Sequence, residues 1–167
     1  MLRLVSLAAC LALSATGSAL AQAPVVSPPP SLAPSPAAAA GKAFLATNAK
    51  APGVVVLPSG LQYKVVASGP KDGPSPKLGD IIKVHYEGKL LDGTVFDSSF
   101  ERNQSVIMPL DGLVQAWLDA LPMMKVGDEW VLYVPPELGY GDRETGPIPP
   151  GSVMVFRLKL LGMLAVD

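Results

Sequence analysis

The segment VHYEGKLLDGTVFDSS (84–99) holds the side chains of this chain that are best suited to acid–base or nucleophilic chemistry. Asp97 precedes two serines, and His85 is the only histidine. A serine nucleophile needs a general base on its own face, whereas strand alternation predicts that His85 points to solvent. There is also no G-x-S-x-G elbow. We therefore interpret Ser98 and Ser99 as turn residues.

The residue types give no support to metal or cofactor chemistry. One histidine cannot build a cluster of metal ligands. No glycine-rich loop follows a strand and opens a helix, so a nucleotide site is not predicted. We expect no metal and no cofactor. With 13 Lys and Arg against 14 Asp and Glu, and without a basic cluster, nucleic acid is not an expected partner.

Bulky aromatic side chains are concentrated at positions that face one way. They are Tyr86, Phe96, Trp117, Tyr140 and Phe156. Such side chains usually fill a core, but two details favour a lined cavity. Tyr140 lies in the Pro- and Gly-rich loop PPELGYGDRETGPIPP (135–150), where an exposed aromatic ring needs something to cover. Asp97 is predicted to face inward, so its carboxylate needs a partner such as the Tyr86 hydroxyl or Arg102.

Period-two alternation predicts the strands that position these residues. They are expected at 61–65, 82–87, 94–97, 106–108, 129–134 and 154–160. The segment DGLVQAWLDALP (111–122) repeats apolar residues at helical spacing, with Asp111 as the predicted N-cap. Strands before and after a single helix favour an α+β domain, in which an antiparallel sheet wraps around one short α-helix.

The opening MLRLVSLAACLALSATGSALAQ predicts a secretory signal peptide over 1–21, cleaved after Ala21. Its apolar run approaches the ~18 residues of a membrane-spanning helix, so a retained anchor is an alternative, as is lipidation at Cys10. Cleavage removes Arg3 and the only cysteine, which leaves 12 Lys and Arg against 14 Asp and Glu. We expect an exported, periplasmic protein that has no disulfide and no membrane contact after cleavage.

The segment that follows is rich in proline and alanine and carries almost no charge. It predicts a semi-rigid linker over 22–40. The segment GKAFLATNAK predicts a short helix over 41–50, which together with its lead-in forms a region over 41–58. The domain itself is expected over 59–167.

Several blocks of the chain closely resemble the FKBP-type peptidyl-prolyl cis-trans isomerases. They are VHYEGKLLDGTVFDSSFERN, LVQAWLDALPMMKVGDEWVLYVPPELGYG and GPIPPGSVMVFRLKLL. The stretch from GKAFLATNAK to SGLQYKVV resembles the approach to that domain in the secreted bacterial branch related to macrophage infectivity potentiators. The resemblance runs from about Gly41 to Met163, and its blocks fall in the family's order.

The resemblance implies a strongly bent antiparallel sheet around a short helix (an FKBP-like fold), with a prolyl pocket between the two. It implies catalytic roles for Tyr86, Phe96, Asp97, Trp117, Tyr140 and Phe156. It implies substrate-binding roles for Arg102, Val106, Leu113, Val114 and Ile148. Trp117 is expected to form the floor of the pocket. The Val114 backbone N–H and the Tyr140 hydroxyl are expected to donate to substrate carbonyls.

The implied function is isomerisation of X-Pro bonds in unfolded or proline-containing polypeptides during the folding of exported proteins. Macrolide inhibitors of the family are implied as further ligands. The helix entrance departs from the family's usual Val-Ile-Pro-Gly-Trp, because Gln115 and Ala116 precede Trp117; we expect the fold to be retained. An alternative is a chaperone-like binding module with little turnover. The long dimerisation arm of that branch has no counterpart here, which predicts a monomer.

Overall fold

The computed structural model describes residues 35–166, so the predicted signal peptide (1–21) and most of the predicted linker (22–40) lie outside the described residues. The helical elements are α1 (Pro36–Asn48), α2 (Gln115–Ala120) and two single turns, η1 (Leu121–Met123) and η2 (Pro136–Leu138). The strands are β1 (Val54–Val56), β2 (Gln62–Ala67), β3 (Ile81–Leu90), β4 (Val95–Ser98), β5 (Val106–Pro109), β6 (Glu129–Val134) and β7 (Met154–Leu164).

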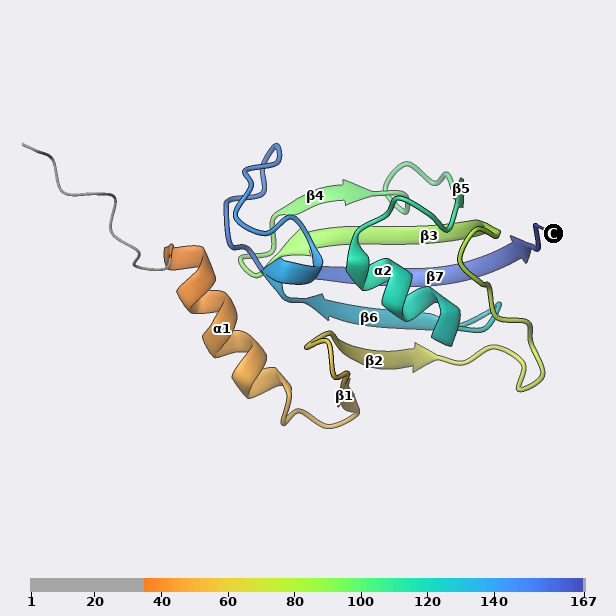
Figure 1. Ribbon diagram of the computed structural model, residues 1–167, viewed down its shortest axis with the longest axis horizontal. Coiled ribbons are helices and arrows are strands. Elements are labelled where there is room, and N and C mark those ends of the chain that lie inside the picture. The colour runs from red at the N-terminus through yellow and green to blue at the C-terminus, as the bar shows by residue number, and fades with distance from the viewer. Residues whose placement is uncertain (1–34, 167) are drawn as a thin grey trace, which may run out of the picture. The chain divides into compact units, whose positions relative to one another are not determined.

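All of these strands join one antiparallel sheet in the order β1-β2-β6-β7-β3-β4, with β5 paired to β3. The longest pairing joins β3 to β7, from Ile81 opposite Leu164 to Leu90 opposite Met154. Figure 1 shows α2 lying across one face of this sheet. The predicted α+β class, an antiparallel sheet around one short helix, is confirmed, and α1 lies at the end of the sheet.

The alternation of apolar residues decides which face of the sheet meets α2. On β3, Ile82 and Val84 are fully buried, while Lys83 between them is exposed. On β7, Leu158 and Leu160 are fully buried. Because full burial of such a side chain contributes roughly 1.5–3 kcal/mol, a register in which these residues faced solvent is strongly disfavoured. The two central strands therefore present one fixed inner face to the helix.

Helix α2 begins at Gln115, later than the start at Asp111 that the sequence pattern predicts. Val114 is its N-cap residue, with an extended backbone (φ −59°, ψ 142°) and no side-chain cap. Gly112 has a positive φ of 65°, which glycine adopts at little cost. The predicted Asp111 cap is therefore wrong, because residues 112–114 form a non-helical turn ahead of the helix.

Helix α1 begins at Pro36, ahead of the predicted start at residue 41, so residues 36–40 are helical although we assigned them to the linker. Three local features explain the earlier start. The Ser35 side chain accepts a hydrogen bond from the Ala38 N–H and caps the helix. Proline is favoured in the first helical turn, and alanine has the highest helix propensity.

Helix α1 contacts the sheet at the start of β2 and the end of β6. The Asn48 amide donates to Gln62 Oε1 at 2.9 Å, and the Gln62 amide donates to the Leu45 carbonyl, also at 2.9 Å. The rings of Phe44 and Tyr133 have centroids 5.8 Å apart. Gln62 is only 4% exposed, so these bonds satisfy a polar side chain that α1 buries.

Replacing Gly41 by alanine tests how closely α1 approaches the rest of the domain. In an open helix this change stabilises by about 1 kcal/mol. Here the added Cβ would lie 2.6 Å from Val153 Cγ2, so we expect a lower free energy of unfolding. Ala43→Gly, at an exposed position of the same helix, measures the propensity effect alone. Urea unfolding compares the variants, and a stabilised Gly41→Ala chain would contradict the close contact.

Candidate functional site

A cavity of about 320 Å³ opens between α2 and the inner face of the sheet. Its walls come from β3, β4, β5 and β7, from the turn before α2, from α2 itself and from the loop after η2. The lining residues are Tyr86, Phe96, Asp97, Met108, Gly112, Leu113, Val114, Trp117, Tyr140 and Phe156. Eight of the residues predicted from the sequence are thus brought together around one mostly apolar cavity.

Trp117 is one of the two most buried residues of this lining, at 5% exposure like Phe156. Its ring meets Tyr86 edge to face, with centroids 5.2 Å apart and planes at 75°. It meets Phe156 in the same way, at 5.6 Å and 83°, and Phe96 in turn stands edge-on to Phe156 at 5.6 Å. Edge-to-face pairs are a preferred arrangement of aromatic rings. Each ring therefore holds its neighbour in place, and the cavity does not depend on a ligand for its shape.

Asp97 is the acidic side chain of the cavity lining, and both of its oxygens accept hydrogen bonds. The Tyr86 hydroxyl donates to Oδ2. Arg102 Nη1 donates to Oδ1 at 2.5 Å. The Asp97 and Arg102 side chains are 40% and 49% exposed, so the ion pair adds little to the free energy of unfolding. Its effect is to fix the direction of the carboxylate at the mouth of the cavity.

The protonation states of this pair follow from the same contacts. Burial raises the pKa of Asp97, but the hydrogen bonds from Tyr86 and Arg102 together outweigh it, so that this pKa lies below its usual value. Burial, followed by the hydrogen bond to Asp97, raises the pKa of Tyr86. At neutral pH the cavity therefore holds a carboxylate and a protonated phenol that donates to it.

The cavity lining does not include the remaining predicted residues, Arg102, Val106 and Ile148. Arg102 contacts the site through Asp97. Val106 is half-buried on β5, and Ile148 is 4% exposed, with its backbone paired to Thr145. Strand alternation offered a signal for a residue that we did not assign to the site: Met108, two positions after Val106 on β5, lines the cavity. Nothing in the sequence pattern marked Gly112, which reaches the cavity because of the non-helical turn.

The two serines and the histidine stabilise the side of the cavity that β3 and β4 form. Ser98 and Ser99 are 3% and 0% exposed. Ser98 ends β4 and Ser99 begins the turn that follows, so the interpretation as turn residues is confirmed for Ser99 and wrong for Ser98. The Ser99 hydroxyl accepts a hydrogen bond from the Tyr86 N–H at 2.8 Å and lies 2.9 Å from His85 Nδ1. His85 is half-buried because its ring stacks on Phe100 at 4.8 Å. These contacts hold β3 to the segment after β4, which explains why the hydroxyls are buried.

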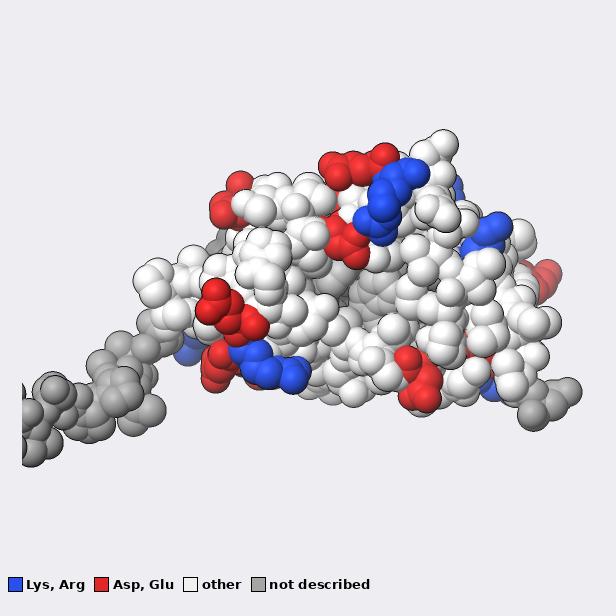
Figure 2. Space-filling model, turned by 90° about the horizontal axis from the view of Figure 1, so that it is seen from above, with Lys and Arg blue, Asp and Glu red and all other residues white. Residues whose placement is uncertain are grey.

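The distribution of charge suits an uncharged ligand. Figure 2 shows acidic and basic side chains in separate small groups, with no broad area of one sign on that face. Glu129 pairs with Arg157 at 2.7 Å and lies 3.8 Å from Lys159. Within residues 35–166 no cluster of three His, Cys, Asp or Glu side chains is suited to a metal ion. The cavity can exclude water and hold an apolar group, with hydrogen-bonding groups at its mouth.

Comparison with known proteins assigns most of the chain to two family models. Residues 73–161 match the FKBP-type peptidyl-prolyl cis-trans isomerase model. Residues 32–65 match the domain amino-terminal to FKBP-type peptidyl-prolyl isomerase. The second match includes α1, β1 and the first part of β2.

Individual relatives cover most of this chain, while the chain covers only part of them. The peptidyl-prolyl cis-trans isomerase Mip of Coxiella burnetii is 45% identical over 123 residues, which is 73% of this chain and 53% of Mip. The FKBP-type 22 kDa isomerase of Escherichia coli is 46% identical over 128 residues, 76% of this chain and 61% of that protein. The chain therefore spans little more than half the length of these relatives.

Solved structures agree with this assignment. The crystal structure of FkpA from Escherichia coli gives a TM-score of 0.71 at 39% identity, covering 75% of this chain and 58% of FkpA. A peptidyl-prolyl cis-trans isomerase from Pseudomonas syringae pv. tomato also gives 0.71, at 32% identity, covering 77% of this chain and 94% of that one.

The Tyr86→Phe variant tests the hydrogen bond within the cavity. Loss of the phenol donor is expected to raise the pKa of the Asp97 carboxyl toward its usual value. Because its pKa is lowered in the folded chain, Asp97 adds to the free energy of unfolding at pH values above the ordinary carboxyl pKa. This contribution is lost as the pH falls through the Asp97 pKa, so Tyr86→Phe is expected to lose less stability on acidification. Carbon-13 NMR titration of the carboxyl measures the shift. Tyr63→Phe, on β2, is the control, and an unchanged Asp97 pKa in Tyr86→Phe would contradict the bond.

Proposed function

The chain belongs to the FKBP-type peptidyl-prolyl cis-trans isomerase family, and from this membership we propose that it catalyses the cis–trans isomerisation of X-Pro peptide bonds. One structural observation supports the proposal in addition to family membership. The apolar cavity above Trp117 has room for a small apolar ring and carries hydrogen-bonding groups at its mouth. The proline ring of a polypeptide substrate fits this combination, because the ring is apolar while the carbonyls on either side of it need donors.

Rotation about the X-Pro bond requires no reactive side chain. Resonance gives the peptide bond a rotation barrier of about 18–20 kcal/mol and places partial charges on its oxygen and nitrogen. A dry apolar site solvates this charge-separated planar form poorly, so the twisted amide is favoured relative to the planar one. A cavity that fits the twisted geometry better than the planar one lowers the barrier. We propose that the aromatic walls around Trp117 provide both effects.

Two donors are proposed to hold the substrate while it rotates. The Val114 N–H lies at the N-terminal end of α2, where the first backbone N–H groups have no acceptor within the helix. Tyr140, half-buried in the loop after η2, carries a hydroxyl at the cavity wall. Donation to the carbonyls that flank the X-Pro bond fixes one side of the bond while the other turns.

The ionised pair at the mouth has an orienting role in this proposal. Asp97 fixes the Tyr86 ring, which packs edge-on against Trp117. The carboxylate also places negative charge next to an otherwise apolar cavity, and Arg102 balances that charge from the solvent side. Because Tyr86 and Asp97 come from adjacent strands, their bond keeps the wall closed between β3 and β4.

The residue before proline is expected to be apolar, like most of the lining.

We also propose that the natural substrates are exported proteins, encountered in the periplasm. The support is the predicted signal peptide over 1–21 together with the secreted branch that the chain resembles. One similar protein is named outer membrane protein MIP, in Legionella longbeachae. No helix within residues 35–166 has the length and apolar character needed to cross a membrane. The mass of the mature chain purified from cells tests export, since cleavage after Ala21 leaves Gln22 first.

Catalysed refolding of a protein limited by a slow X-Pro bond tests the activity. The chain is expected to accelerate the slow phase, and Tyr140→Phe is expected to lower kcat/KM about two- to tenfold, the effect of one lost hydrogen bond. Tyr133→Phe removes a hydroxyl on the outer face of the sheet and should leave the rate unchanged. If the unsubstituted chain left the slow phase unchanged or prolonged it, the binding-module alternative would replace the isomerase.

A further inference from the structure

Ser35 joins the start of α1 to a loop that is 115 residues away in sequence. Its hydroxyl donates to the Pro150 carbonyl at 3.0 Å. The same oxygen accepts the Ala38 N–H at 3.1 Å as the helix cap. A hydroxyl has one hydrogen to donate and lone pairs that accept, so both bonds form at once. The residue that begins α1 therefore also fixes the carbonyl of Pro150.

Two glycines allow α1 to approach this loop closely. Gly151 has a φ of +72°, and a Cβ there would lie 2.9 Å from Ala38 Cβ and 3.2 Å from Ser35 Oγ. On the helix, a Cβ added at Gly41 would lie 2.6 Å from Val153 Cγ2. The backbone of residues 150–153 thus lies directly against the first turns of α1.

The contact continues from the loop to the cavity. The Gly151 N–H, next to the carbonyl that Ser35 binds, donates to the Gly141 carbonyl at 2.9 Å. Gly141 follows Tyr140, and its own N–H donates to the Pro136 carbonyl at 2.8 Å. Tyr140 lines the cavity. A continuous series of bonded residues therefore leads from Ser35 to the proposed substrate donor.

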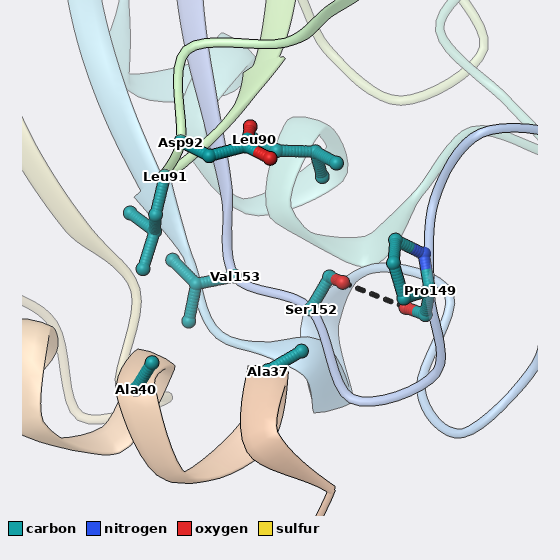
Figure 3. A pocket seen from close by; sticks show the side chains of 8 residues that line it. All are labelled: Ala37, Ala40, Leu90, Leu91, Asp92, Pro149, Ser152 and Val153. Carbon is teal, nitrogen blue, oxygen red and sulfur yellow. Dashed lines mark hydrogen bonds between the residues drawn. The ribbon is translucent and has the colours of Figure 1, made fainter.

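Part of this end of α1 is not packed against the domain. A second cavity, of about 330 Å³, lies between the helix and the domain. Its lining residues are Ala37, Ala40, Leu90, Leu91, Asp92, Pro149, Ser152 and Val153. Figure 3 shows the small side chains of Ala37 and Ala40 at its edge, and the Ser152 hydroxyl bonded within the loop to Pro149. Alanine methyl groups do not fill this space, so helix and loop are connected by the Ser35 bond together with the close packing of Ala38 and Gly41 on residues 151–153.

We propose that Ser35 is a positioning residue for Tyr140, and that α1 supports the wall of the isomerase cavity through the loop at 150–153. The inference rests on the proposed function for its effect on catalysis, but the connection itself is a property of the fold. Loss of the bond to Pro150 frees the loop, and the Tyr140 hydroxyl then spends less time where it donates to substrate.

Substitutions at Ser35 separate the connection from the helix cap. Ser35→Thr keeps both hydrogen bonds. Ser35→Asp keeps the cap, because a carboxylate accepts the Ala38 N–H and favours a helix N-terminus, but it has no hydrogen for Pro150. We expect Ser35→Asp to lower kcat/KM about two- to fivefold, within the effect of one hydrogen bond, and Ser35→Thr to retain the rate. Circular dichroism shows whether α1 is intact in each variant.

A double-mutant cycle tests whether Ser35 acts through Tyr140. In the Tyr140→Phe background the Ser35→Asp change should have almost no further effect, because the hydroxyl that it positions is gone. Additive losses in kcat/KM, or a Ser35→Asp chain as active as the unsubstituted one, would overturn the proposal.

Hydrogen exchange of the Gly151 amide provides a readout that is independent of activity. Ser35→Asp should increase its exchange rate about tenfold, while Ser35→Thr should not, because local opening controls exchange. Unchanged exchange in Ser35→Asp would overturn the connection. If the unsubstituted chain were inactive while the exchange result held, the proposed function alone would fail.

Discussion

The edge-to-face packing of Trp117 against Tyr86 and Phe156 is the contact on which the rest of this structure depends. It joins α2 to the two longest strands, β3 and β7, which the chain brings together from distant positions. Edge-to-face contact is a preferred arrangement of aromatic rings. All three residues line the cavity, so the same contact that packs the helix onto the sheet also forms the apolar side of the cavity.

The residues around that cavity explain why the proposed isomerisation needs no reactive side chain. The barrier to peptide rotation comes from charge separation within the amide, so a site that excludes water and offers a few fixed donors is sufficient. The polar groups are accordingly placed at the mouth, where Asp97, Tyr86 and Arg102 satisfy one another and remain partly solvated. The apolar floor and the polar mouth do separate work on the same bond.

The sequence predicted the parts of the molecule that follow from periodicity. Alternation located the inner face and every strand except β1, which lies in the region assigned to the lead-in, and the aromatic residues on that face do meet around one cavity. Alternation reports a face and not the curvature of a strand, so Met108 was not assigned to the lining. The substrate-binding roles that the resemblance implied for Val106 and Ile148 stay predictions. The start of α2 depends on the positive φ of Gly112, and the burial of Ser99 depends on a bond to another strand. Such features arise from tertiary contacts, which local patterns do not encode.

The most direct test of the central claim is to locate a bound proline ring. A short peptide with an apolar residue before proline can be mixed with the isotope-labelled chain and examined by filtered nuclear Overhauser spectroscopy. We predict cross-peaks between the proline ring protons and the Trp117 indole, and none to Trp130, which is stacked on Tyr63 away from the cavity lining. Binding of the peptide without any contact to Trp117 would contradict the account.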